Sequence, residues 1–182
     1  MPRKLPVVIA ASAAVLATAS PALAAPGGGD KPFRLRHSTQ VVDPTGVVCG
    51  TEYPTPYRAV GTGNLSHLGR VSLDLEACNT GLGPVGTAVG TATYTAANGD
   101  VLEIAFQGSY VVEFDVASQT ATSVLTADAI PGATSGTGRF AHAEVNGQLI
   151  QTDVTSLSTG ATTGTGQGSG TIAYFASDRS AG

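Results

Sequence analysis

The sequence predicts an all-β protein, and three observations support that prediction. Short runs of alternating apolar and polar residues recur along the chain, as they do in strands that bury one face. Turn-forming pairs such as Asn98-Gly99 separate these runs. Beyond the N-terminus, no long segment has the apolar periodicity of an amphipathic helix. Roughly eight to ten short strands of this kind form an antiparallel sandwich or a closed barrel.

Residues 1–24 have the features of a secretory signal peptide. Arg3 and Lys4 give a positive start, an apolar run follows over 5–16, and Ala22-Leu23-Ala24 is a small-residue cleavage motif. The apolar run is too short to cross a bilayer, although an uncleaved anchor is the alternative interpretation. We therefore expect cleavage after this motif and export, either to the extracellular space or to a bacterial cell envelope.

The rest of the chain fits one domain. Residues 25–32 are rich in Gly and Pro, which predicts a flexible segment ahead of a single domain over 33–178. The full sequence has 13 acidic and nine basic residues, a net charge of −4, and no basic run. This charge disfavours binding to nucleic acid, and to a membrane once the signal peptide has been removed.

Cys49 and Cys78 are the only cysteines in the sequence. Two cysteines in an exported protein most simply form a disulfide, which would stabilise the fold by about 3.5 kcal/mol on the chain-entropy model. Free thiols are the alternative. Neither cysteine lies in a metal-ligand spacing, and no phosphate-binding loop is present, so we expect no cofactor.

The alternating runs place the strands in order along the chain. In the run 70–77, Val71, Leu73 and Leu75 fall on one face, and polar residues fall on the other. Several strands share this division between an apolar face and a small or polar face, which favours a barrel with an interior pocket over a sandwich. The predicted strands are 33–42, 57–68, 70–77, 87–95, 101–107, 110–116, 119–127, 139–145, 148–156 and 171–176.

Turn signals separate these strands. Asn98-Gly99 and Asn146-Gly147 each predict a tight hairpin, because Asn-Gly readily adopts the positive φ angles of such a turn. The glycines over 132–138 predict a turn that leads into the strand 139–145. The segment 158–170 is rich in Gly and Thr and predicts a mobile loop.

Three segments together carry a family resemblance. They are Gly-Asn-Leu-Ser-His-Leu-Gly-Arg over 63–70, Tyr-Thr-Ala-Ala-Asn-Gly-Asp over 94–100, and Gly-Thr-Gly-Arg-Phe-Ala over 136–141. In this order and spacing they resemble bacterial secreted proteins related to the allene oxide cyclase barrel. The third segment is also similar to the Gly-Thr-Gly-x-Phe segment of plant dirigent proteins. The resemblance spans about residues 57–176.

The resemblance implies an eight-stranded antiparallel β-barrel of the calycin type, commonly a homotrimer, with a ligand cavity in its mouth. Such barrels include oxylipin cyclases and isomerases, dirigent proteins that steer radical coupling, natural-product cyclases and a demethylase of the phenazine pyocyanin. Fold does not select among these activities. We therefore expect a barrel that binds an apolar or aromatic small molecule and, as the catalytic hypothesis, cyclises or isomerises it without a cofactor. The alternatives are a non-catalytic ligand-binding or envelope protein and a pyocyanin demethylase-like enzyme.

Four residues are candidates for acid–base catalysis. Asp74 and Glu76 share one face of a predicted strand, where a cavity would raise the pKa of at least one carboxyl group by desolvation and mutual repulsion. His142 and Glu144 share a face after Phe140, where the family pattern has small residues. In both cases the alternative is a solvated outer face, because alternation alone does not tell which face is inside. That ambiguity also applies to Glu103, Glu113 and Asp115.

Aromatic side chains are the candidates for ligand binding, through stacking or through phenol hydroxyls. The alternative is ordinary packing in the barrel. The aromatic candidates are Tyr94, Phe106, Tyr110, Phe140 and Tyr174.

Overall fold

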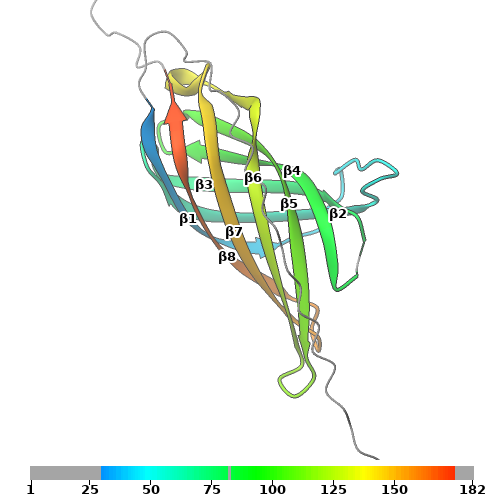
Figure 1. The fold of residues 1–182 in the computed structure, drawn as a ribbon. Helices are drawn as coiled ribbons and strands as arrows, with labels where there is room; N and C mark the ends of the chain where they lie inside the picture. Colours follow the sequence, from blue (N-terminus) through cyan, green and yellow to red (C-terminus); the bar gives the residue numbers. More distant parts are fainter. Residues whose placement is uncertain (1–29, 82, 175–182) are drawn as a thin grey trace, which may run out of the picture.

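The computed structural model describes residues 30–81 and 83–174. The predicted signal peptide, most of the predicted flexible segment and the last residues of the predicted domain, 175–178, lie outside this part of the chain. Within it, eight antiparallel strands each pair with the next, and the last pairs with the first (Figure 1). The prediction of an all-β, eight-stranded antiparallel barrel is therefore confirmed. The strands are β1 (Lys31–Val41), β2 (Thr55–Leu65), β3 (Gly69–Asn79), β4 (Val85–Ala96), β5 (Val101–Asp115), β6 (Thr120–Gly136), β7 (Glu144–Ser156) and β8 (Thr162–Ala173).

Alternation along the strands fills the barrel with apolar side chains. On β3, Val71, Leu73 and Leu75 are buried inside, whereas Ser72 and Glu76 are exposed outside. The same rule holds in the first half of β5, where Leu102, Ile104 and Phe106 are buried inside. The apolar faces of the strands are therefore the inner faces.

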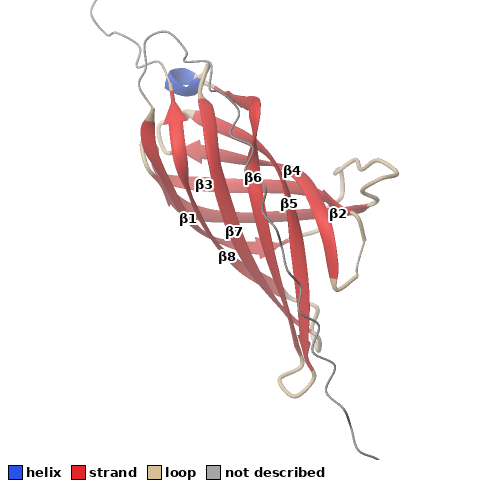
Figure 2. Ribbon diagram, in the orientation of Figure 1, coloured by secondary structure: helices blue, strands red, loops and turns tan. Residues whose placement is uncertain are grey.

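One end of the barrel is closed by the motif that carries the family resemblance. A short 3₁₀ helix, η1 (Gly138–Phe140), crosses this end and buries Phe140 completely (Figure 2). Gly138 has a φ of +59°, and a Cβ there would meet the carboxylate of Asp100. Arg139 forms an ion pair with that carboxylate at 3.1 Å, and the Thr137 hydroxyl accepts a hydrogen bond from the Val101 amide at 3.1 Å. The segment 136–141 thus joins the β4–β5 hairpin to η1. We call η1 with its buried Phe140 the plug of the closed end.

Five local predictions are wrong, and most of these errors concern Gly or Asn-Gly. The glycine segment 132–138, predicted to be a turn, lies largely within β6, which extends to Gly136. The segment 158–170, predicted to be a mobile loop, contains most of β8, whose alternating glycines face inward. The segment 139–145, predicted to be a strand, is mostly η1 and a turn. Asn146-Gly147 lies within β7, paired with Thr171 and Gly170, and makes no hairpin. A single strand, β5, replaces the two predicted around Gly108. Except at 139–145, where η1 and a turn replace the predicted strand, pairing with neighbouring strands overrides the local preference for a turn.

The predicted disulfide is present. Cys49, in the β1–β2 connection, is bonded to Cys78 near the end of β3, with Cα atoms 5.6 Å apart. The bond fastens this connection at the end of the barrel opposite η1. Among the described residues, no helix is long and apolar enough to span a bilayer.

Removing the plug side chain is expected to destabilise the fold. Phe140→Ala should lower the free energy of unfolding by about 3–5 kcal/mol, because it empties a fully buried site. Phe114→Ala is the matched control: this side chain is 60% exposed, and its truncation should cost less than about 1 kcal/mol. Urea denaturation measures both, and equal losses would contradict the assignment of Phe140 as the plug.

Candidate functional site

A cavity of about 430 Å³ opens at the end of the barrel opposite η1. This volume lies within the range of small-molecule sites, and most of the lining is apolar. The strands bring to it the ends of β1, β3, β5 and β7 and the starts of β2, β4, β6 and β8. Its apolar lining includes Val41, Leu75, Ala77, Ala88, Tyr110, Val112, Phe114, Ala121, Leu125 and Leu157.

One wall of this cavity is polar. The Tyr57 hydroxyl donates a hydrogen bond to Oδ2 of Asp153 at 2.9 Å, and Nε2 of Gln151 donates to Oδ1 of the same carboxylate at 2.7 Å. All three side chains line the cavity. A carboxylate can accept about four hydrogen bonds, so Asp153 keeps acceptor capacity for a ligand.

Two further side chains, from β1, form hydrogen bonds with the Gln151 amide. Its Nε2 also donates to the Thr39 hydroxyl at 2.9 Å, and its Oε1 accepts from Nε2 of His37 at 2.6 Å. Because both amide hydrogens of Gln151 are used, the orientation of the amide is fixed. His37, Thr39, Tyr57, Gln151 and Asp153 form one connected group, which we call the polar wall.

Glycines on β8 make room for the polar wall. In the β-sheet register Gly166 lies between Gln151 and His37, and Gly164 lies between Asp153 and Thr39. A Cβ at Gly166 would meet the His37 ring and the Gln151 amide oxygen. A Cβ at Gly164 would meet the Asp153 carboxylate, the Gln151 amide nitrogen and the Thr39 hydroxyl. The side chains of β1 and β7 can therefore meet only because β8, which lies between them, has glycine and no side chain at these positions of its inner face.

Burial shifts the ionisation of three groups in the polar wall. Desolvation raises the pKa of Asp153, although the hydrogen bonds from Gln151 and Tyr57 oppose that shift. Desolvation also lowers the pKa of His37, which favours the neutral ring. It raises the pKa of Tyr57 as well, and the neighbouring Asp153 adds to that shift, so the phenol keeps its proton. Asp153 is consequently the group best suited to exchange a proton in the cavity.

Apolar side chains continue from the cavity to its rim. Tyr110 is buried and donates its hydroxyl hydrogen to the Gly81 carbonyl at 2.5 Å, so its ring is fixed in the wall. Phe114 and Leu157 line the opening and are 60% and 49% exposed. Exposed apolar side chains around a cavity mouth suit the passage of an apolar ligand.

The carboxylates predicted on β3 lie outside the barrel. Asp74 accepts two hydrogen bonds from Arg58, at 3.0 and 2.6 Å, and Glu76 lies 3.6 Å from the same guanidinium group. Both point away from the buried face of β3, so the solvated-face alternative describes their position. The outer-face alternative also describes Glu103, Glu113 and Asp115, which are exposed.

His142 and Glu144 lie at the closed end. His142 follows η1, and Glu144 is the first residue of β7; both are exposed, and neither lines the cavity. The structure does not bring them near Asp74 or Glu76. The catalytic role predicted for these four residues stays a prediction without support from the cavity.

Of the five aromatic candidates, Tyr110 lines the cavity. Tyr94 and Phe106 are buried deeper in the core. Phe140 belongs to the plug, where its ring centroid lies 5.1 Å from that of Tyr174. Sequence reasoning thus named Tyr110 but missed Tyr57, Gln151 and Asp153, which stand at the polar wall.

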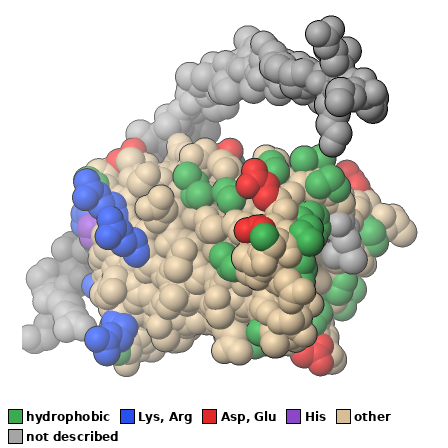
Figure 3. All heavy atoms as spheres, turned by 90° about the horizontal axis from the view of Figure 1, so that it is seen from below, with side chains coloured by type: hydrophobic (Ala, Val, Ile, Leu, Met, Phe, Trp, Pro, Cys, Tyr) green, Lys and Arg blue, Asp and Glu red, His purple; other side chains and the backbone are tan. Residues whose placement is uncertain are grey.

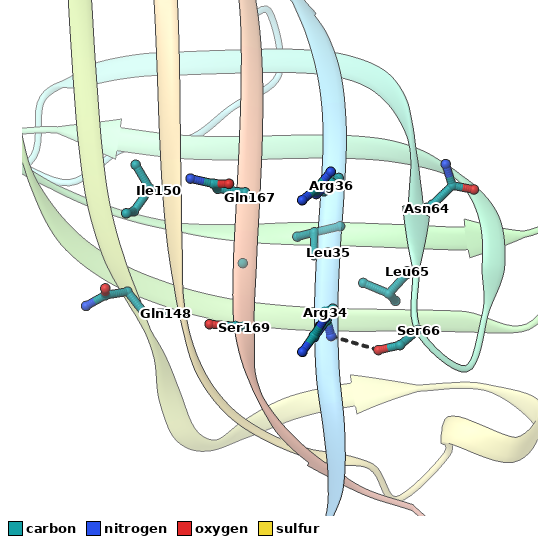
Figure 4. Close-up of a pocket in the computed structure, with 11 residues that line it drawn as sticks. Arg34, Leu35, Arg36, Asn64, Leu65, Ser66, Gln148, Ile150, Gln167 and Ser169 are labelled. Carbon is teal, nitrogen blue, oxygen red and sulfur yellow. Dashed lines mark hydrogen bonds between the residues drawn. The ribbon is translucent and has the colours of Figure 1, made fainter.

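A second hollow lies on the outer wall of the barrel, over β7, β8, β1 and β2 (Figure 4). Arg34, Arg36, Asn64 and Gln167 border it, and all four are exposed. The ionisable residues among those described at its lining, Arg34 and Arg36, are exposed, so its chemistry is that of an open polar face. The cavity at the end of the barrel, which holds the partly buried Asp153, is therefore the stronger candidate site.

The described residues contain no group of three or more His, Cys, Asp or Glu side chains that could hold a metal ion. Comparison of the chain with protein-family models, curated proteins and solved structures found no match. The case for a function therefore depends on the cavity itself.

A methyl group on the bare face of β8 should disturb the polar wall. Gly166→Ala is expected to lower the free energy of unfolding by about 1–3 kcal/mol, because the new Cβ collides with His37 and Gln151. Gly168→Ala is the matched control on the same face, since its Cβ would come no closer than 3.1 Å to the Gln148 carbonyl oxygen. Thermal and urea unfolding of the two variants compare them. An equal effect would show that the polar wall does not depend on Gly166.

Proposed function

We propose that this protein binds an apolar small molecule in the open end of its barrel. The observation that carries the proposal is the cavity of about 430 Å³, which is mostly apolar and has the polar wall on one side. Apolar lining supplies the free energy of binding, and a few fixed polar groups orient the ligand. The resemblance to the allene oxide cyclase barrel agrees with this proposal.

The polar wall is prearranged for such a role. Gln151 and Tyr57 hold both oxygens of Asp153, and His37 and Thr39 hold Gln151. A ligand therefore meets a group whose rotamers are already fixed, which lowers the entropy lost on binding.

Export of the mature protein is part of the proposal. The disulfide between Cys49 and Cys78 suits an oxidising compartment, in agreement with the signal peptide predicted over 1–24. The homotrimer remains a prediction. Val85, Val111 and Val124 are adjacent on the outer face and would suit a contact between subunits.

Filling the cavity should abolish ligand binding. Nile red, a neutral apolar dye, is expected to fluoresce more strongly with the wild-type protein, and Ser123→Phe should remove most of that gain by occupying the cavity. Thr126→Phe, on the outer face of the same strand, is the matched control and should leave the gain intact. Fluorescence titration measures both variants. A gain that survives Ser123→Phe would place the dye elsewhere and contradict the proposal.

A second candidate function is proton transfer without a cofactor, and the raised pKa of Asp153 favours it. A suitable probe is 5-nitrobenzisoxazole, which opens to a coloured cyanophenolate when a base removes its C3 proton. The base must be ionised, so the rate should rise with pH through a midpoint above 3.8, the ordinary carboxyl value. Asp153→Asn should slow the reaction by about 100-fold, whereas Asp74→Asn should not change it. Unchanged absorbance kinetics in Asp153→Asn would exclude Asp153 as the base.

A further inference from the structure

We propose that the cavity selects protonated amines: ligands with an apolar body and an ammonium group that binds Asp153. The inference rests on the proposed binding function and names the chemical class of the ligand. It follows from the hydrogen-bond polarity of the polar wall, from the charges that line the cavity, and from the charges around its mouth.

The polar wall offers acceptors to a ligand. Tyr57 has one hydroxyl hydrogen and donates it to Asp153, so its oxygen can only accept from a ligand. Gln151 uses both amide hydrogens, on Asp153 and Thr39. Asp153 accepts these bonds and keeps free lone pairs. A ligand with N–H donors fits this wall, whereas a carboxylate would meet like charge and no donor from these three side chains.

Asp153 also lacks a cationic partner within the described part of the chain. The ion pairs there join Arg58 to Asp74 and Glu76, and Arg139 to Asp100. No Lys or Arg is among the described residues that line the cavity. The nearest group that could be a cation is His37, and burial favours its neutral form. An ammonium ion would therefore compensate a carboxylate that the protein leaves without a counter-charge.

Charge around the mouth favours the same ligand. Figure 3 shows Lys and Arg side chains gathered at one side of the molecule, whereas most of the Asp and Glu side chains in view lie away from them, several among hydrophobic ones. The strand order explains this division: Lys31, Arg34 and Arg70 lie in the first halves of β1 and β3, toward the closed end. The open end carries the exposed carboxylates Asp43, Glu52, Glu113 and Asp115. Arg58 also lies at this end, but its charge is offset by Asp74 and Glu76. Such a field attracts cations to the cavity and repels anions.

Aromatic rings line the same cavity as Asp153. Tyr57, Tyr110 and Phe114 all line the cavity. Their faces can contact an ammonium group or an aryl body without demanding one geometry. The cavity therefore suits a ligand of modest size with an alkyl or aryl body and one terminal ammonium group.

A matched set of three probes tests the inference. 4-Phenylbutylamine, 4-phenylbutan-1-ol and 4-phenylbutyrate share one apolar body and differ in the terminal group, which is cationic, neutral or anionic at pH 7. Isothermal titration calorimetry of the full mature protein measures each dissociation constant. The amine is expected to bind at least about tenfold more tightly than the alcohol, as for a charge-assisted hydrogen bond, and the carboxylate should bind most weakly.

Two variants assign the preference to one carboxylate. Asp153→Asn should remove the preference for the amine and leave binding of the alcohol within about twofold, whereas Asp74→Asn should leave both unchanged. Circular dichroism and the unchanged alcohol affinity verify that Asp153→Asn is folded. An alcohol that binds as tightly as the amine, or a preference that survives Asp153→Asn, would overturn the inference and leave the proposed function standing. If no probe binds and Ser123→Phe does not affect Nile red, the proposed function fails too.

Discussion

The close approach of β1 and β7 across the bare inner face of β8 is the constraint on which the site depends. Side chains of these two strands would ordinarily be kept apart by those of the strand between them. Gly164 and Gly166 remove that barrier, so His37 and Thr39 reach Gln151, which in turn donates a hydrogen bond to Asp153. The barrel gives up core volume at these positions, and hydrogen-bonded polar groups occupy the space. Because each side chain of the polar wall is hydrogen-bonded to another member, the polar wall behaves as one unit.

The barrel separates stability from binding along its axis. The closed end holds the plug of η1 and Phe140 and the apolar core around Tyr94 and Leu102. The open end is less completely filled, and there the disulfide from Cys78 fastens the β1–β2 connection. The cavity removes packing contacts from this end of the barrel. The disulfide offsets part of that lost stability in the same region.

Alternation predicted the class of fold, because period-two patterning follows directly from a strand with one buried face. It could not predict which polar residues face inward. Asp74 lies on a clean amphipathic strand and is outside, whereas Asp153 lies on a strand whose inner face is mixed, with Leu149, Gln151 and Asp153 in succession. The missed signal was the strict alternation of glycine with Thr, Gln and Ser over 163–171. Its glycine content predicts mobility, but glycine at every second position also describes a strand whose inner face has no side chains.

Asp153 is better suited to ligand binding than to stabilising the barrel. A partly buried carboxylate without a cation lowers the stability of a fold, and its raised pKa expresses that penalty. The hydrogen bonds from Tyr57 and Gln151 reduce the penalty without neutralising the charge. The arrangement becomes favourable when a ligand supplies the missing positive charge, so the carboxylate that weakens the empty barrel is the one that would strengthen its complex with an amine.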